Sequence, residues 1–389
     1  MVRKTIDVVF FFGAGASAPF GIPTMKQFVP DFEKLLAEEG TKSEQTMYTI
    51  IKEGLERRLG KQHVDLEAIF TVIDGIIAYT PEKLGLLSTY LSTGLKNVTD
   101  DDSHTGKSLK LRFQNFVREK CIIPQESFDK IGMVYHDFFN RFALEFPEGI
   151  NTNGSYAWHD SWTIFTTNYD TCLEHYWRVK AGVGIDTGFE FDRARNVNTL
   201  RSRRFLMGDS GKQLVKLHGS VNWLIEERTG DVVEEEMTSG HSHMGRRYVG
   251  EMMIYPVAEK ELYLDPYISM LLRLNQDLER KSTWIVVGYS FNDPIVREIF
   301  VRRSNPTKHL VLVHPQAATV GAERLGGIRA KTSLVEKRFG LERDAIREVS
   351  VGQIITSLLM DEDFRKVNHQ IIHKLKDNPA HSWEKTPTP

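Results

Sequence analysis

The sequence predicts an α/β protein with a Rossmann-like parallel sheet, a large helical insertion and C-terminal helices. Three observations support this fold class. Short apolar runs recur along the chain, and several are continuously apolar, which is typical of strands buried on both faces of a parallel sheet. The first run passes directly into a glycine turn, Gly13-Ala14-Gly15. A long region with mainly helical spacing, ending near residue 160, then separates the first run from the second.

Six segments have the composition of strands, and helical spacing dominates between the first two of them. The predicted strands cover residues 7–12, 161–166, 213–217, 252–255, 283–288 and 309–313. Apolar residues at spacings of three and four predict helices over residues 25–39, 44–59, 64–79 and 125–146. The polar segment 97–106 is predicted to be a loop, and residues 353–375 are predicted to form a further helix.

This order of elements predicts three parts. Residues 1–30 and 155–330 form the core that carries the sheet, residues 31–154 form the helical insertion, and residues 331–389 form a C-terminal helical segment with a polar tail. An ordinary dehydrogenase is not favoured. In that fold a second strand follows the first helix and leads to an acidic residue about 20 positions beyond the glycines, whereas Asp31 and Glu33 lie within a helical pattern.

Composition and charge narrow the function classes. The chain of 389 residues has a formal net charge of −2, so it lacks the basic excess of a dedicated nucleic-acid binder, and direct nucleic-acid binding stays open. Its cysteines, Cys121 and Cys172, suggest a reducing compartment and cannot form a cysteine-rich zinc site alone. The apolar N-terminal run is too short for a signal peptide, and no segment predicts a membrane span. We therefore expect a cytoplasmic protein without a membrane partner.

The glycine turn after the first strand predicts a phosphate site. Gly13 and Gly15 lack the side chains that would keep the backbone away from a pyrophosphate. A helix predicted to begin directly after them would add free N–H groups and a favourable dipole. Alone, this glycine pattern is a weak signal for a nucleotide.

Three later segments place polar residues after other predicted strands: FTTNYD at 165–170, KLHGS at 216–220 and VVGYSFND at 286–293. Open α/β sheets bind ligands at the carboxyl ends of their strands. The Asn168 amide both donates and accepts, so it could bind a ribose hydroxyl or a water. His218 could accept a proton from either group near neutral pH.

Structural alternatives exist for each of these residues. Asn168 and Asp170 could cap the helix expected over residues 171–180, and Asp293 could cap the helix that begins at Pro294. His218 could be a structural histidine.

Weaker features lie elsewhere in the chain. His314, after the strand at 309–313, could line an adenine pocket, and His241 and His243 resemble a metal pair without convincing further ligands. The arginines of residues 193–204 could meet phosphate or nucleic acid, although a solvated face or a subunit contact is favoured.

Taken together, the four segments resemble the sirtuin family, specifically its bacterial branch of NAD-cleaving antiphage defence proteins. GAGAS with Gly21-Ile22-Pro23 looks like the first NAD loop, TTNYD like the second motif, KLHGS like the catalytic-histidine motif and GYSFND like the ribose-binding motif. The resemblance covers residues 6–30 and 160–315.

The resemblance implies an NAD+ glycohydrolase, with NAD+ as substrate and with Asn168 and His218 as the catalytic pair. It implies that NAD+ is lined by Gly13, Ala14, Gly15, Ala16, Ser17, Thr167, Asp170, Gly288, Tyr289, Ser290 and Asp293. It also implies a homo-oligomer that acts in antiphage defence by NAD depletion, with a separate partner such as a HerA-type ATPase.

Departures from the deacylating sirtuins leave two other functions as alternatives. Those enzymes carry four zinc cysteines between the histidine and ribose motifs, whereas residues 219–287 contain none, so no zinc is expected. Thr24-Met25-Lys26 replaces their Asp-Phe-Arg. The alternatives are an NAD-dependent protein deacylase and a non-catalytic NAD or ADP-ribose binding subunit of a nuclease or helicase complex. Hydrolysis and transfer of ADP-ribose to another acceptor are both consistent with these residues.

Overall fold

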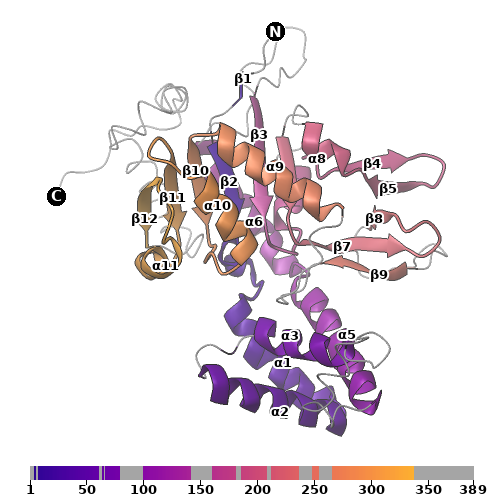
Figure 1. Cartoon of the computed structure of the whole chain (residues 1–389). Helices are drawn as coiled ribbons and strands as arrows, with labels where there is room; N and C mark the ends of the chain where they lie inside the picture. The colour runs from indigo at the N-terminus through magenta and orange to yellow at the C-terminus, as the bar shows by residue number, and fades with distance from the viewer. Residues whose placement is uncertain are drawn as a thin grey trace, which may run out of the picture. The chain divides into compact units, whose positions relative to one another are not determined.

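The computed structural model describes residues 4–5, 8–60, 64, 66–78, 100–141, 160–180, 185–207, 212–235, 248–253 and 265–336 (Figure 1). The contacts within the chain divide it into two compact units. The first unit comprises Met1–Ile22, Ile123–Met252 and Leu262–Pro389, and the second comprises Pro23–Ile122 and Met253–Glu261.

The first unit contains a parallel sheet of seven strands. They are β1 (Lys4–Thr5), β2 (Val8–Phe12), β3 (Asp160–Thr166), β6 (Lys212–Lys216), β10 (Thr283–Val287), β11 (His309–Val313) and β12 (Lys331–Val335). Their order is β6–β3–β2–β10–β11–β12, with every pair parallel and β1 paired with the start of β3. Counted along the chain without the short β1, this is the 3-2-1-4-5-6 order of dinucleotide-binding sheets. The Rossmann-like parallel sheet predicted from the sequence is therefore confirmed.

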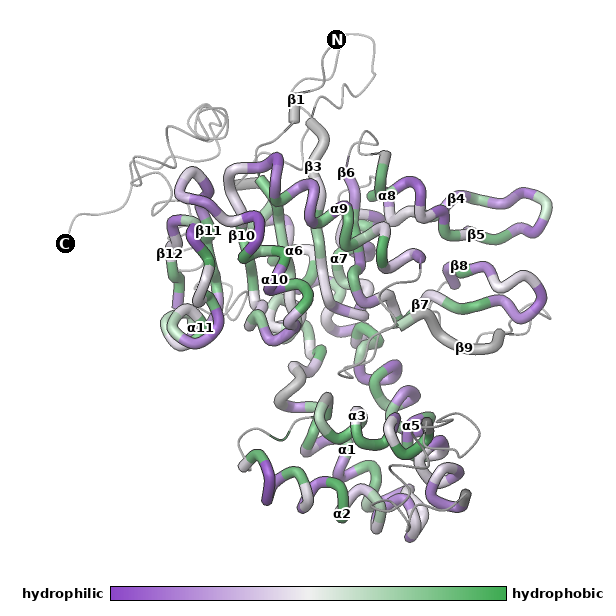
Figure 2. Tube along the Cα trace, viewed as in Figure 1, coloured by the Kyte–Doolittle hydropathy of each residue, from purple (hydrophilic) through white to green (hydrophobic). Residues whose placement is uncertain are grey.

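The central strands are continuously apolar because helices cover both faces of the sheet. On β2, Phe10 and Phe12 both contact Phe138 of α6 (Phe128–Arg141), with ring centroids 5.8 and 5.5 Å apart. Phe11 points to the opposite face and contacts Phe300 of α10 (Pro294–Arg303) at 5.5 Å. Every residue of β2, β10 and β11 is buried, and Figure 2 shows these strands as largely hydrophobic. Burial of each phenylalanine contributes about 1.5–3 kcal/mol.

A second, five-stranded sheet follows the order β4–β5–β8–β7–β9 and belongs to the same unit up to Met252 in β9. Its strands are β4 (Phe189–Asp192), β5 (Val197–Leu200), β7 (Gly219–Glu226), β8 (Val232–Glu234) and β9 (Tyr248–Met253). The pairs β4–β5, β5–β8 and β7–β8 are antiparallel. Val197, Leu224 and Val233 form a small apolar core within it. Of these strands, the sequence predicted only the end of β9.

The remaining helices of the first unit connect these strands. They are α7 (Cys172–His175) with the π-helical η5 (Tyr176–Lys180), α8 (Arg203–Met207), α9 (Tyr267–Arg280) and α11 (Ala317–Arg324), and the turn η4 (Gln125–Ser127) precedes α6. Among the helices that the structure describes, none combines the length and apolar character needed to cross a membrane.

The second unit is helical and consists of α1 (Met25–Glu39), α2 (Lys42–Leu59), α3 (Leu66–Ala78) and α5 (Asp100–Lys120). Its core is aromatic: Phe70 and Phe113 stack with centroids 3.9 Å apart, and Phe32 contacts both rings. The buried Glu44 is satisfied by Ser108 at 2.7 Å and by the Thr41 capping box. Burial opposes ionisation of Glu44, but these hydrogen bonds and the positive charge of Arg112 together outweigh it and lower the pKa of the Glu44 carboxyl.

Three segments differ from the sequence predictions. Residues 100–106 are not a loop, because α5 begins at Asp100 and acidic residues are favourable in a first helical turn. Lys331–Val335 is not helical but forms β12, an edge strand whose exposed positions explain its polar sequence. The helical insertion was predicted over residues 31–154, whereas the helical unit comprises Pro23–Ile122 and Met253–Glu261. Helix α6 lies in the sheet-bearing unit instead, because its aromatic residues cover β2. The predicted helix at 353–375 lies outside the described residues.

We predict that Thr41→Ala destabilises the helical unit by about 1 kcal/mol, because the Glu44 N–H loses its capping acceptor. Hydrogen exchange of the first amides of α2 measures the effect. Thr49→Ala is the matched control, since the Thr49 hydroxyl is exposed on the same helix, and it should cost less than about 0.5 kcal/mol. Equal exchange rates in the two variants would contradict the prediction.

Candidate functional site

The polar motifs identified in the sequence gather at one edge of the parallel sheet. They follow β2, β3, β6 and β10, and the carboxyl ends of parallel strands lie at the same edge. After β2, the strands β3 and β6 are added on one side of the sheet, and after β10, the strands β11 and β12 are added on the other side. The strand order therefore reverses between the neighbours β2 and β10. Open α/β sheets bind their ligands at this point.

The glycine loop after β2 closes directly onto the turn after β10. Gly13 N donates to the Val287 carbonyl and Gly15 N to the Gly288 carbonyl, both at 2.9 Å. A Cβ on Gly13 would lie 2.6 Å from the Tyr289 Cα. Gly288 has a φ of +65°, and a Cβ there would lie 2.3 Å from Ala16 N. In this structure the glycines therefore permit the close approach of two backbone segments.

The helix predicted directly after the glycines does not form. Two 3-10 turns, Ala14–Ala16 and Ala18–Phe20, take its place. Pro19 lies in the second turn, which ends at Gly21 in a left-handed conformation with a φ of 86°. The Ala16 and Ser17 amides donate to carbonyls within the loop. The expectation of free N–H groups at a helix N-terminus was therefore wrong, since these amides already have acceptors.

Asn168 connects the end of β3 to the glycine loop. Its Nδ2 donates to the Gly13 carbonyl at 3.0 Å and to the Ser17 hydroxyl at 2.9 Å, and its backbone N–H donates to Thr166 Oγ1 at 3.0 Å. The residue is only 9% exposed, and within the described structure its buried Oδ1 has no hydrogen-bond partner. Both donors of the amide are committed, so the oxygen is the polar atom of this side chain that lacks a hydrogen-bond partner.

Asp170 supports the start of the following helix. Its Oδ1 accepts from the Cys172 amide at 3.0 Å, which is a local capping interaction ahead of α7. Burial raises the pKa of the Cys172 thiol well above its ordinary value, and the Asp170 carboxylate raises it further. Cys172 therefore stays a protonated thiol and not a nucleophile.

Burial also raises the pKa of the Tyr135 hydroxyl, although a hydrogen bond with Ser17 acts in the opposite direction.

Lys216, the first residue of KLHGS, is a site residue that the sequence analysis missed. Its side chain is fully buried at the end of β6, and its Nζ lies 2.8 Å from Glu174 Oε1. The same ammonium donates to the carbonyls of Tyr169 and Asp170. This lysine thus holds the turn that carries Asn168 against β6. A lysine placed directly between the apolar run Leu214-Val215 and Leu217 was the available sequence signal.

His218 lies in the turn between β6 and β7 and is paired with Asp293. Its Nε2 is 2.9 Å from Asp293 Oδ2, and the two side chains are 13% and 6% exposed. Gly219, which follows the histidine, has a φ of 79°, a conformation that favours glycine. Asp293 also caps α10, as the structural alternative predicted, because its Oδ1 accepts from the amides of residues 295 and 296.

The other predicted ligand residues lie at the same edge with differing exposure. Ala16, Ser17, Asp170 and Tyr289 are buried, and Ala14, Gly15, Thr167, Gly288 and Ser290 are half-buried. The Tyr289 ring packs 4.7 Å from Phe11, so it belongs to the core beneath the loop. Phe291 has a φ of 56°, which costs about 1–2 kcal/mol for a residue with a side chain.

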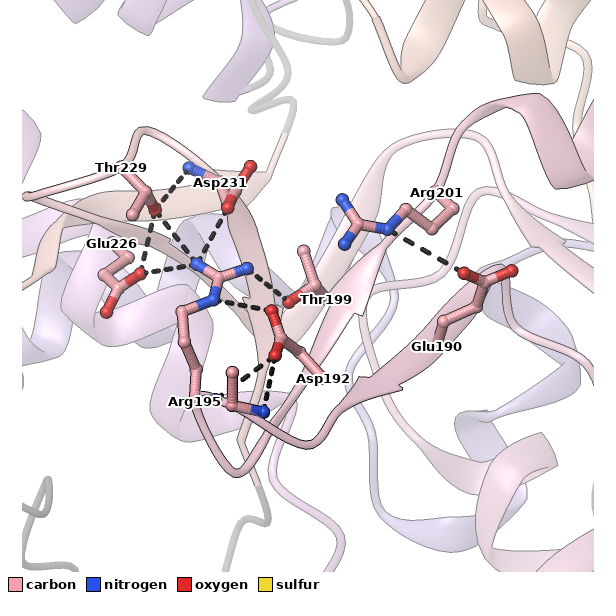
Figure 3. Close-up of polar contacts among 9 residues, drawn as sticks. Glu190, Asp192, Arg195, Thr199, Arg201, Glu226, Thr229 and Asp231 are labelled. Atoms are coloured by element: carbon pink, nitrogen blue, oxygen red, sulfur yellow. Dashed lines mark hydrogen bonds and ion pairs between the residues drawn. The ribbon is translucent and has the colours of Figure 1, made fainter.

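The weaker sequence features are mostly accounted for within the chain. Figure 3 shows Arg195 between Asp192 at 2.8 Å, Glu226 at 3.0 Å and Asp231 at 2.8 Å. Arg204 pairs with Asp186 at 3.1 Å. These two arginines are therefore neutralised by carboxylates of the same unit.

The last of the weaker sequence features are His314 and the predicted metal pair. His314 Nδ1 accepts from the Gln316 amide at 3.0 Å, which is a local turn contact. His241 and His243 lie outside the described residues. Within the part of the chain that is described, no group of three or more His, Cys, Asp or Glu side chains is arranged to hold a metal ion.

Residues 163–333 match the family model of the SIR2-like domain. The matched segment contains Asn168, His218 and Asp293, whereas the glycine loop precedes it. A comparison with curated protein sequences finds no match.

The chain is also distantly similar to several solved Sir2 structures. One is from a description of the mechanism and regulation of Sir2 enzymes, at 13% identity over 94% of this chain and 93% of that chain, with a TM-score of 0.36. A Sir2 homologue variant with ADP-ribose has 15% identity over 92% and 97%, with a TM-score of 0.40. A Sir2 homologue with NAD has 14% identity over 94% and 90%, with a TM-score of 0.33.

We predict that Gly288→Ala destabilises the sheet-bearing unit by at least about 2 kcal/mol, since the added Cβ meets the backbone of Ala16 and the left-handed conformation adds strain. The tryptophans that the structure describes, at positions 162, 177, 223 and 284, all belong to this unit, so urea unfolding followed by tryptophan fluorescence reports on it. Gly326→Ala is the matched control, because a Cβ there meets nothing within 4 Å. Equal midpoints for the two variants would contradict the prediction.

We predict that Lys216→Met lowers the stability of the same unit by about 3 kcal/mol, because the substitution leaves Glu174 unpaired in a largely buried position. The same fluorescence assay applies. Arg302→Met removes a cation from an exposed pair, with side chains 74% and 54% exposed, and should cost less than about 0.5 kcal/mol. The prediction fails if Lys216→Met is as mild as this control.

Proposed function

We propose that the protein is an NAD+ glycohydrolase, which cleaves NAD+ to nicotinamide and ADP-ribose. The observation that carries the proposal is the buried Oδ1 of Asn168, which has no hydrogen-bond partner among the described residues and lies after β3, beside the reversal point of a dinucleotide-type sheet. The match of residues 163–333 to the SIR2-like domain supports NAD as the dinucleotide.

The register of the sheet brings the two proposed catalytic residues to the same level. Thr166 of β3 pairs with Lys216 of β6, and Asn168 and His218 each follow two residues later. An amide acceptor and a histidine on neighbouring strand ends suit a ribose, whose hydroxyls donate hydrogen bonds. At Gly13 and Gly15 the loop has no side chain at its contact with the turn after β10.

In the proposed reaction, the bond between ribose C1′ and the nicotinamide nitrogen breaks, and its electron pair passes to the pyridinium ring. Nicotinamide therefore leaves as a neutral molecule. A water oxygen bonds to C1′, and the proton of that water passes to His218 as general base, directly or through a ribose hydroxyl. Asn168 accepts a hydrogen bond from the water or the ribose through Oδ1, while its Nδ2 stays on Gly13 and Ser17.

The proposed biological setting follows from the sirtuin-like resemblance. An enzyme that depletes NAD+ harms its own cell unless it is restrained, which suits antiphage defence by a cytoplasmic homo-oligomer with a partner such as a HerA-type ATPase. The proposed hydrolysis needs no metal, since the cationic nicotinamide already weakens the bond, and we expect activity to survive chelation.

We predict that the purified full chain releases nicotinamide and ADP-ribose in equal amounts. His218→Ala and Asn168→Ala should each slow the release by about 100-fold or more, because the general base or the ligand-facing acceptor is lost. Chromatography of both products measures the rate. His104→Ala, an exposed histidine of the helical unit, is the control and should retain full activity.

Two outcomes would contradict the proposed function. Nicotinamide release that requires an acylated peptide would indicate a deacylase. NAD+ binding without turnover by the folded wild-type protein, both alone and with its partner, would indicate a regulatory subunit.

A further inference from the structure

We infer that Asp293 is a positioning residue, whose carboxylate holds the His218 ring so that Nδ1 is the nitrogen that accepts the proton. The inference rests on the proposed function for the role of that proton in the reaction. The orientation of the ring itself can be measured without any turnover.

The Asp293 carboxylate is held in place from both sides. Its Oδ1 accepts from Ile295 N at 2.9 Å and Val296 N at 3.2 Å, so this oxygen caps α10. Its Oδ2 lies 2.9 Å from His218 Nε2. A residue that served only as a cap would need Oδ1 alone. The second contact couples the start of α10 to a turn 75 residues earlier in the chain.

This geometry determines which nitrogen of His218 carries the proton in the neutral ring. An ionised carboxylate only accepts hydrogen bonds, so Nε2 must be the donor toward Asp293. A neutral imidazole has a single N–H, and its lone pair is therefore on Nδ1. After Nδ1 accepts a proton, the neighbouring carboxylate stabilises the imidazolium.

The backbone next to both partners adopts left-handed conformations. Gly219, next to His218, and Phe291, two residues before Asp293, both have positive φ angles, of 79° and 56°. Phe291 is 1% exposed, and its ring packs 5.2 Å from Phe300 of α10. Burial of this ring offsets the strain and keeps Asp293 at the start of α10. A local cost at a non-glycine residue is consistent with a constrained functional turn.

The decisive variant is Asp293→Asn, because asparagine caps helices as well as aspartate does. Its Oδ1 can keep the cap of α10, and its Nδ2 then faces His218 Nε2 as a donor. The ring can keep this contact only if Nε2 becomes the acceptor and the proton moves to Nδ1. Asp293→Ser is the second variant, since a serine hydroxyl can also cap the helix but has no second polar atom for His218.

The experiment records the ring nitrogen signals of the full chain labelled with ¹⁵N-histidine, at a pH where the ring is neutral. His218→Gln identifies the His218 signals among those of the 13 histidines. We expect the Nε2–H tautomer in the wild type, the Nδ1–H tautomer in Asp293→Asn and a faster exchanging ring proton in Asp293→Ser. Nicotinamide release by Asp293→Asn should fall by about 100-fold or more through kcat, with KM nearly unchanged.

The outcomes separate the inference from the proposed function. If His218 keeps the Nε2–H tautomer in a folded Asp293→Asn, the inference is overturned whatever the rate of turnover. A freely exchanging Nε2–H in the wild type would overturn it even if the variants fail to fold. If the tautomer changes as expected but no protein releases nicotinamide, the orientation by Asp293 stands and the glycohydrolase proposal fails.

Discussion

The contact between the glycine loop and the end of β10 is the constraint on which the candidate site depends. Two backbone hydrogen bonds, from Gly13 to Val287 and from Gly15 to Gly288, join the first strand of one half of the sheet to the first strand of the other. Because the loop is held there, the Gly13 carbonyl is available to orient the Asn168 amide. The same contact sets the start of the turn that leads to Asp293, and Asp293 in turn contacts His218. Both proposed catalytic residues, Asn168 and His218, therefore depend on it.

Polar groups at this edge of the sheet are buried, and most of them are satisfied in pairs. Lys216 is neutralised by Glu174, and the Asp293 carboxylate is bonded by His218 and by two amides of α10, so each of these buried carboxylates has hydrogen-bond partners. The Asn168 oxygen is an exception, since it is buried without a partner among the described residues. An unsatisfied buried acceptor costs about 1–3 kcal/mol, a cost that a hydroxyl of a bound ligand would remove.

The sequence predicted the parallel sheet and the gathering of its motifs because both depend on local patterns. Continuous apolar runs mark buried strands, and polar residues that end such runs must meet at one edge. The strands β4, β5 and β8 went unpredicted because they contain only three or four residues and owe their pairing to partners elsewhere in the chain. The pairing of His218 with Asp293 was equally inaccessible, since it spans 75 residues. The 3-10 turns after Gly13 replaced the expected helix because the loop amides bond to nearby carbonyls.

A crystal structure of the full-length His218→Ala variant with NAD+ would test the central claim most directly, because the substrate should persist when the base is absent. The account predicts the dinucleotide across the carboxyl ends of β2 and β10. Asn168 Oδ1 should then lie within hydrogen-bond distance of the nicotinamide ribose or its attacking water, with Nδ2 still on Gly13 and Ser17. NAD+ bound elsewhere, or an Asn168 amide that has turned its oxygen away from the ligand, would contradict the account.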